Sequence, residues 1–289
     1  MTASIPSKGK GVPTRRGYGA GMTDASASHS GFGGLLRGCR VRQGLSQQEL
    51  AVRAGTTTRH LSFLETGRSR PRTGMVLRLA AELGLSPREQ NAMLEAAGLR
   101  TVFPHRALTD SEMSRYGAVI DSLLERHEPL PAAVVDRYGA LVRTNEAFER
   151  LTPGMVGVEP EDLVDRLFGP GPWRATLVNW PDVAAAWLAR HRVEADRTGD
   201  PRLRALISRA ERLIGPLPEG TGTPELPALC ARIRAGEEVI ELFTVTVRFD
   251  HAHDVTLNEL RVELMYAGND TADRFFGTAN TVKAGGRRT

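Results

Sequence analysis

Apolar side chains recur at helical spacing on either side of Gly55. Leu50 and Ala51 fall on one face of a first short helix, and Leu61 and Leu64 fall on one face of a second. Because glycine adopts a positive φ without strain, the residue between the two segments suits a tight corner. The pattern predicts a helix-turn-helix, a motif whose second helix can enter the major groove of DNA.

Helical periodicity extends over residues 32–100 and predicts an all-α domain of five helices. Ser46, with Glu49 three positions later, has the pattern of a capping box and predicts the start of the second helix. Thr56 or Thr57 is expected to cap the third helix, which would be the recognition helix.

A different pattern follows a linker at residues 101–109 and predicts a second domain over residues 110–267. The expected elements are a helix at 110–126, a hairpin of strands at 132–136 and 140–144, a helix capped by Asn145, a mostly helical segment at 161–235, and strands at 239–249 and 259–266. An antiparallel sheet flanked by helices, an α+β domain, is the expected result.

The two ends of the chain lack periodic apolar positions. Residues 1–31 are rich in Gly, Ser, Ala and Thr, so we predict that they are disordered. Met1 and Met22 are both candidate starts, and the residues alone do not choose between them. Residues 268–289 are expected to form a polar, loose tail.

Charge is distributed unevenly although the formal net charge is only +4. Residues 32–72 contain eight arginines and two glutamates, a balance of +6. Residues 109–270 contain 18 basic and 27 acidic residues, a balance of −9. A small basic domain joined to a larger acidic one fits DNA binding by the first domain and a different task for the second.

Several classes of protein are disfavoured by the composition. Cys39 and Cys230 are too few and too far apart for a zinc pattern or a disulfide framework, so both are expected to be reduced structural thiols. No run approaches the roughly 18 apolar residues of a membrane span. The basic N-terminal residues precede no apolar core of a secretory signal. We therefore expect a cytoplasmic protein with no membrane partner.

The helix-turn-helix segment resembles the lambda-Cro or XRE-type repressors. The residues that carry the resemblance are Gln47, Leu50, Ala51, Ala54, Gly55, Leu61, Leu64, Glu65, Gly67 and Pro71. The run RHLSFLETGRSRPR at 59–72 is similar to one subgroup, regulators with a C-terminal MmyB-like ligand-binding domain. The resemblance implies a lambda-repressor-like fold for residues 32–100, and it implies an ion pair between Glu65 and Arg40.

Predicted base contacts come from the second helix of the motif. Thr58, Arg59 and Ser62 occupy outward positions and can bond base edges or phosphates. The resemblance implies that Thr58, Arg59 and Phe63 reach bases, with Arg59 gripping guanine O6 and N7. For Phe63 there are two equally favoured interpretations, a base contact and a half-buried position in the domain core. Thr57, at the helix start, completes this set.

Predicted phosphate contacts surround the same helix. The resemblance implies that Gln47 bonds a phosphate, and His60 is expected to contact one as well. Arg68, Arg70 and Arg72 follow the helix in a loop suited to phosphate contacts, and Arg72 is a candidate for probing the minor groove.

Residues 108–267 resemble the MmyB-like ligand-binding domain. The resemblance rests on HEPLPAAVVD at 127–136, the hairpin leading to Asn145, Asn179–Trp180 and DVTLNELRVE at 254–263. It implies a PAS-like pocket for a small apolar ligand, with a fatty acid as the leading candidate. The expected walls are Val134, Leu141, Trp180, Trp187, Leu242 and Val262, with Arg174 or Arg190 for a carboxylate; the alternative is that these residues fill a closed core.

An enzyme is the less favoured interpretation of the second domain. His251 and His253, with Asp250 and Asp254, suggest a metal site, but a polar turn between the last two strands is the favoured explanation. No nucleophile elbow, phosphate-binding glycine loop or dinucleotide fingerprint is present. We expect no catalytic residue, no metal and no cofactor.

The sequence thus predicts a ligand-responsive transcriptional regulator that binds a double-stranded DNA operator as a homodimer. One helix-turn-helix reads only a half-site, and two-fold symmetry doubles that recognition. The alternative for the second domain is a protein-interaction module without a small-molecule ligand.

Overall fold

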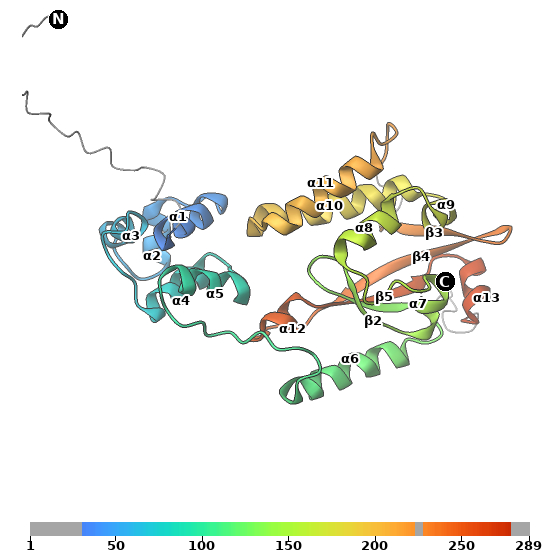
Figure 1. Cartoon of the computed structure of the whole chain (residues 1–289), viewed down its shortest axis with the longest axis horizontal. Coiled ribbons are helices and arrows are strands. Elements are labelled where there is room, and N and C mark those ends of the chain that lie inside the picture. Colours follow the sequence, from blue (N-terminus) through green and yellow to red (C-terminus); the bar gives the residue numbers. More distant parts are fainter. Residues whose placement is uncertain (1–30, 223–227, 279–289) are drawn as a thin grey trace, which may run out of the picture.

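The computed structural model describes residues 31–222 and 228–278 of the chain. They form a small helical domain and a larger domain built on an antiparallel sheet, with a long connecting segment between them (Figure 1). The disorder predicted for residues 1–31 falls, apart from Gly31, outside the described residues.

The five helices predicted for the first domain are confirmed. They are α1 (Phe32–Arg42), α2 (Gln47–Arg53), α3 (Thr58–Glu65), α4 (Thr73–Glu82) and α5 (Pro87–Ala96). The capping box of α2 is present, since the Ser46 hydroxyl accepts a hydrogen bond from the Glu49 amide and the Glu49 carboxylate accepts one from the Ser46 amide. Gly55 has a φ of +61° and forms the corner between α2 and α3.

Gly33 allows α1 to lie against the C-terminal end of α3. A Cβ atom at this position would lie 2.4 Å from the Glu65 carbonyl oxygen and 2.7 Å from that of Leu64. Beneath this contact the domain core is fully closed, with Leu36 and Leu61 completely buried. The close approach fixes α3 on the rest of the domain.

The second domain contains one five-stranded sheet in the order β2-β1-β5-β4-β3, with every neighbouring pair antiparallel. The strands are β1 (Ala132–Val135), β2 (Leu141–Thr144), β3 (Cys230–Ala235), β4 (Glu238–Val247) and β5 (Arg261–Ala267). The predicted hairpin and the two later strands are confirmed. The expectation of helix up to residue 235 is wrong at β3, which forms a hairpin with β4 around Gly236.

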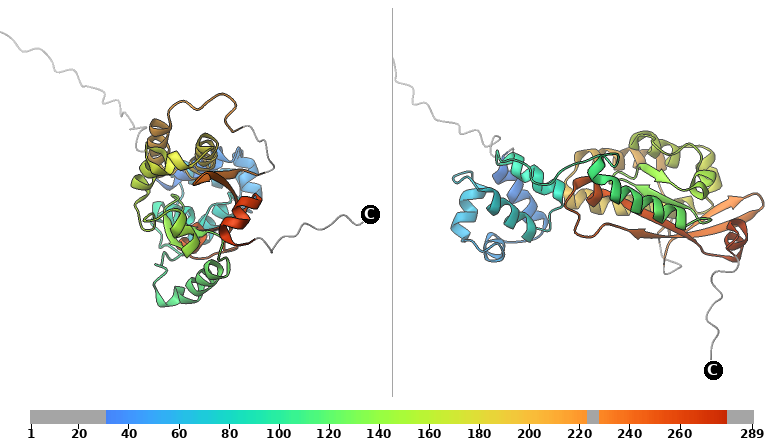
Figure 2. Two further views of the ribbon diagram at one scale, coloured as in Figure 1. Left: turned by 90° about the vertical axis from the view of Figure 1, so that its right-hand side faces the viewer. Right: turned by 90° about the horizontal axis from the view of Figure 1, so that it is seen from below.

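Helices cover both faces of β1. Ala132 and Val134 pack against α6, whereas the alternate residues Ala133 and Val135 pack beneath α7 and α8. Figures 1 and 2 place α6 apart from the pair α10 and α11. The bounds are η2 (a 3-10 helix, Ser111–Met113), α6 (Ser114–Arg126), α7 (Glu146–Leu151), α8 (Pro160–Phe168), α9 (Pro172–Thr176), α10 (Trp180–Thr198), α11 (Pro201–Ile214) and α12 (Val255–Glu259).

The loose tail predicted for residues 268–289 is wrong at residues 270–276, which form helix α13 (Asp270–Phe276). The Asn269 side chain caps this helix by accepting a hydrogen bond from the Ala272 amide at 2.9 Å. Ala272 and Phe276 are buried among apolar side chains of β3 and β4. The sheet domain therefore extends beyond the predicted limit at residue 267.

Among the described residues, no helix combines the length and the apolar character that a membrane crossing requires.

Candidate DNA interface and interdomain cavities

Helix α3 presents the predicted base-reading side chains on its outer face. Thr57 is the cap, since its hydroxyl accepts a hydrogen bond from the His60 amide at 3.1 Å. Thr57, Thr58 and Arg59 are exposed, whereas Ser62 and His60 are half-buried. Thr58 and Ser62 are four positions apart and share one face of α3, and Arg59 adjoins that face.

Arg59 and Phe63 form a cation–π contact, with the guanidinium carbon 5.4 Å from the ring centre. Phe63 is half-buried and its ring carries Arg59, and its contact with a base stays a prediction. Within the described chain Arg59 forms no ion pair, so its donors remain available. A stacked, unpaired guanidinium is well suited to two parallel hydrogen bonds with guanine.

The loop after α3 carries three exposed guanidinium groups. Arg68, Arg70 and Arg72 are exposed, and none pairs with a carboxylate among the described residues. Their loop is tied to α3 by a hydrogen bond from the Ser69 amide to the Phe63 carbonyl at 3.1 Å. Unpaired arginines beside a recognition helix suit phosphate contacts.

Glu65 links α3 to α1 through the ion pair expected with Arg40, which is confirmed. The Arg40 Nε and Nη2 atoms lie 2.6 and 3.0 Å from the two carboxylate oxygens. Burial alone would raise the pKa of Glu65, but hydrogen bonds from Arg40 and Gln47 outweigh it and lower the pKa below its usual value. The ionised pair therefore holds α3 in place against α1.

Gln47 takes part in this network. Its amide nitrogen donates to Glu65 Oε2 at 2.7 Å, so the side chain is held by an intramolecular bond. The phosphate contact implied by resemblance stays a prediction, and the hydrogen bond to Glu65 would orient Gln47 for it.

The six residues predicted to line a ligand pocket are distributed over four apolar clusters. Val134 and Val262 are cross-strand partners packed under α6, whereas Leu141 packs with α7 and α8. Trp187 packs among α8, α10 and α11, and Leu242 lies under α13. Trp180 lies at the junction of the last two clusters. The structure does not bring these six side chains around one cavity.

The two arginines considered for a carboxylate head group have other contacts. Arg174 stacks on Trp180, with its guanidinium carbon 3.6 Å from the ring centre, and donates to the Phe168 carbonyl at 3.2 Å. Arg190 forms an ion pair with Glu263 at 3.0 Å. Neither arginine lines a cavity among those described below.

A cavity of about 580 Å³ lies between the interdomain linker, the start of α6 and the connection from β4 to α12. Its apolar lining includes Phe103, Met113, Tyr116, Phe249 and Leu257. Sequence reasoning did not identify this cavity, because its walls come from a linker and a loop. The signal that could have found it is the presence of Phe103 and Phe249 in otherwise polar connecting segments.

Polar groups border the same cavity. Arg106 forms ion pairs with Glu112 and Asp254, the latter at 3.4 Å. His253 stacks on Phe103 with ring centres 6.4 Å apart, and the neighbouring His251 is exposed. In the described part of the chain, no group of three or more His, Cys, Asp or Glu side chains is arranged to hold a metal. His251 and His253 lie at the border of the cavity of about 580 Å³.

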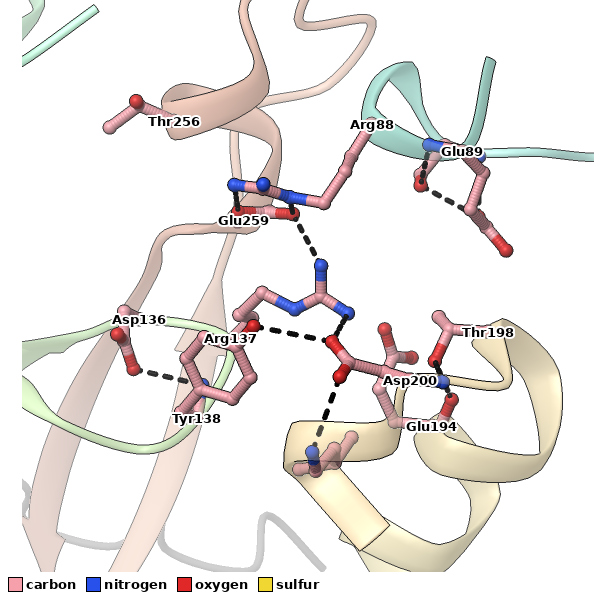
Figure 3. A network of polar contacts seen from close by, with 12 residues as sticks. Arg88, Glu89, Asp136, Arg137, Tyr138, Glu194, Thr198, Asp200, Thr256 and Glu259 are labelled. Carbon is pink, nitrogen blue, oxygen red and sulfur yellow. Dashed lines mark hydrogen bonds and ion pairs between the residues drawn. The ribbon is translucent and has the colours of Figure 1, made fainter. Parts of the chain in front are cut away.

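Ion pairs join the five-helix domain to the sheet domain (Figure 3). Arg88 of α5 pairs with Glu259 of α12, and Glu259 also accepts a bond from the buried Arg137 at 3.0 Å. Arg137 in turn pairs with Asp200 at 2.6 Å. The network makes a continuous polar connection from α5 to the start of α11, and sequence reasoning did not predict it.

A second bridge runs from α10 to the same helix. Arg197 lies 3.0 Å from Glu89 of α5 and 2.8 Å from Glu194 on its own helix. The pKa of Arg197 is raised mainly by its hydrogen bond to Glu194, and the nearby charge of Glu89 raises it further. Two consecutive residues of α5, Arg88 and Glu89, therefore each form an ion pair with the second domain.

Comparisons with known proteins agree with these two domains. The helix-turn-helix family matches residues 36–90, and the MmyB-like transcription regulator ligand binding domain matches residues 117–278. No curated protein matches the chain. Among solved structures, an RNA-binding light-oxygen-voltage receptor is similar at 16% identity, over 92% of this chain and 68% of that one, but its TM-score of 0.22 carries no argument.

The order of the matched segments agrees with the structure. The first match covers helices of the five-helix domain, and the second begins within α6 and ends just after α13. The second match extends over more than half of the chain. The protein therefore belongs to the XRE-type helix-turn-helix regulators that carry a C-terminal MmyB-like, PAS-like ligand-binding domain.

Proposed function

We propose that the protein is a sequence-specific regulator whose helix α3 reads bases through Thr58, Arg59 and Phe63. The family match supports DNA binding by a ligand-responsive transcription regulator. The observation that carries the residue assignment is the stack of the unpaired Arg59 on Phe63, at the exposed face of α3. Arg68, Arg70 and Arg72 hold the flanking phosphates, with Gln47 and His60 as further positioning residues.

The phosphate contacts are tested by the salt dependence of DNA binding. Each phosphate contact that is lost reduces the slope of log affinity against log salt by about one unit. We expect this reduction for Arg68→Gln and Arg70→Gln. Arg78→Gln, an exposed position on α4 outside the proposed surface, is the control. Equal slopes for all three variants would contradict the assignment.

We further propose that the sheet domain binds a small apolar ligand, with a fatty acid as the leading candidate, in the cavity of about 580 Å³. Ligand pockets usually occupy about 300–1,000 Å³ and combine an apolar lining with a few polar groups. Phe103, Met113 and Phe249 supply the apolar lining, and the polar groups at the border include Arg106, which is paired with Glu112 and Asp254. A ligand there contacts the linker and can change how the DNA-binding domain is held.

Native mass spectrometry of the purified full chain tests the ligand. We expect a bound lipid in the wild type and weaker retention of it in Met113→Trp, because the larger ring projects into the cavity and narrows it. Val119→Trp, at a position on α6 that is 47% exposed, is the matched control and retains the lipid. A wild-type protein free of any lipid would instead favour the second candidate, a protein-interaction module.

The regulator is proposed to act in the cytoplasm as a homodimer. Two-fold symmetry would present two copies of α3 to half-sites about 34–36 Å apart, one turn of the DNA helix. Sedimentation of the protein with and without DNA tests this assembly. A strictly monomeric complex on a non-palindromic site would contradict it.

A further inference from the structure

A second and smaller cavity lies at the boundary of the two domains. Its volume is about 120 Å³, and it is bordered by Ser86 at the start of α5 and by groups from α10, α12 and β5. The charged side chains around it are Arg137, Arg197, Arg248, Arg261, Glu194 and Glu259. Four guanidinium groups and two carboxylates thus surround a space large enough for a few non-hydrogen atoms.

The positive charge in this cavity is only partly neutralised. Arg137 and Arg197 belong to the ion pairs that connect the domains. Arg248 and Arg261 form no ion pair with any of the described residues. Counted over the lining residues alone, four arginines face two glutamates, an excess of two positive charges. Asp200 and Glu89, just outside the lining, pair with Arg137 and Arg197, so the two arginines without a carboxylate partner are Arg248 and Arg261.

Arg261 has the most unusual environment of the four. It is only 7% exposed, and its single hydrogen bond runs from Nη2 to the Asp136 carbonyl at 3.0 Å. Its Nε atom is buried without a partner, as is the Nε atom of Arg137. Burial and the nearby charges of Arg190 and Arg248 lower the pKa of Arg261, against the opposing charges of Glu263 and Glu194. A buried guanidinium that no carboxylate contacts directly is costly, and an anion in the cavity would offset this cost.

We propose that this cavity is a binding site for a small, doubly charged oxyanion of the phosphate type, held by Arg248 and Arg261 between the two domains. Guanidinium groups bind such oxyanions through paired N–H donors. An acyl chain does not fit the small, polar space. Glu194 and Glu259 do not exclude the anion, because their carboxylates already pair with Arg197 and with Arg88 and Arg137.

An oxyanion at this position would stabilise the contact between the domains. The cavity is bordered by Ser86 and by Glu259, the residue that pairs with α5. A ligand that binds only the docked arrangement shifts the population toward it. This inference does not depend on the apolar ligand proposed for the larger cavity.

Calorimetric titration of the full chain with inorganic phosphate, in a buffer without other oxyanions, tests the proposal. We expect saturable binding that Arg248→Gln and Arg261→Gln each weaken at least about tenfold, the value of one charge-assisted hydrogen bond. Arg248 is exposed, so its replacement does not threaten the fold. Arg234→Gln, at an exposed position on β3, is the matched control and leaves the affinity unchanged.

Two further titrations identify the site and the kind of ligand responsible for any binding heat. If Arg68→Gln abolishes phosphate binding and Arg248→Gln does not, the anion binds at the DNA interface and the proposal is overturned. If octanoate binds in an Arg248-dependent manner and phosphate does not, the cavity accepts a fatty-acid head group, which also overturns it. The absence of phosphate binding to the wild type has the same consequence.

Discussion

Arg88 and Glu259 meet across the domain boundary in a two-point ion pair. The Arg88 Nε and Nη2 atoms lie 2.6 and 2.9 Å from the two carboxylate oxygens of Glu259, although 171 positions separate the residues in the sequence. Arg88 lies on α5, the last helix of the DNA-binding domain. Glu259 lies on α12, which directly follows the loop that lines the cavity of about 580 Å³. A change at that loop therefore has a direct route to α5.

The two partners are expected to differ in their contribution to stability. Arg88→Gln removes a partly exposed partner and should cost at most about 1 kcal/mol. Glu259→Gln should cost about 2 kcal/mol, because the buried Arg137 also loses a carboxylate partner. Urea unfolding measures both, with Arg150→Gln on the exposed pair with Glu146 as a control near zero. Equal costs would contradict the role of Arg137 in the network.

Two glycines of α1 should respond in opposite directions to replacement by alanine. Gly33→Ala places a methyl group against the Glu65 and Leu64 carbonyl oxygens, so it should destabilise the domain by about 1–3 kcal/mol. Gly38→Ala meets only the end of the Arg42 side chain, 3.5 Å away, and should stabilise the helix by about 0.5–1 kcal/mol. Thermal unfolding gives the sign of each, and a stabilising Gly33→Ala would contradict the close contact of α1 with α3.

Acid should weaken the DNA-binding domain through Glu65. Burial opposes ionisation, but the bonds from Arg40 and Gln47 leave the folded-state pKa below the usual value of 4.5. The ion pair therefore contributes its full stability above that value and loses it as the pH falls through the lower, folded-state pKa. Glu65→Ala should cost about 3–5 kcal/mol at neutral pH, since Arg40 stays buried without its partner.

A matched variant separates this effect from general acid unfolding. Glu49→Gln removes a carboxylate from the exposed capping box of α2 and leaves the Arg40 pair intact. Its unfolding free energy should retain the acid dependence caused by Glu65, whereas Glu65→Ala should flatten it. The same slope in wild type and Glu65→Ala would count against the proposed titration.

His191 should make the sheet domain sensitive to mild acid. Its ring stacks on Trp187 and bonds the Trp187 carbonyl through Nδ1, and burial lowers its pKa from 6.5 to about 4. The unfolded chain takes up a proton at higher pH than the folded one. Stability is therefore complete above pH 6.5 and falls by about 3 kcal/mol as the pH approaches 4.

Comparison with His191→Gln tests this origin. The amide can still donate to the Trp187 carbonyl but does not titrate, so the loss of stability between pH 6.5 and 4 should become smaller. His251→Gln, in an exposed loop, should leave the pH profile of the wild type unchanged. If both variants keep the wild-type profile, another group is responsible.

Local signals were sufficient to predict the DNA-binding domain. Ser46 and Glu49 form a capping box in the order expected from their spacing, and Gly55 has the positive φ expected for the corner. These features depend on residues close in the sequence. The pair between Arg40 and Glu65 spans 25 positions and followed from family resemblance alone.

The sheet domain was predicted less completely. Arg232 and Arg234 alternate with Ala231 and Ile233, a period of two that could have identified β3. Helix α13 was missed because its sequence is mostly polar, although Asn269 supplies a cap. The smaller cavity could not be predicted, because Ser86 meets the sheet domain only through the way the two domains pack. The larger cavity is lined by a linker and a loop, and its sequence signal was limited to Phe103 and Phe249.

The most direct test of the account is selection of binding sites from random DNA with the wild type, Arg59→Gln and Arg68→Gln. Arg59→Gln should relax the preference for guanine at one position of each half-site by about 1–3 kcal/mol. Arg68→Gln should weaken all sites equally and keep the same preferred sequence. Unchanged base preference in Arg59→Gln, or loss of the preference in Arg68→Gln, would contradict the assignment of α3 as the reader.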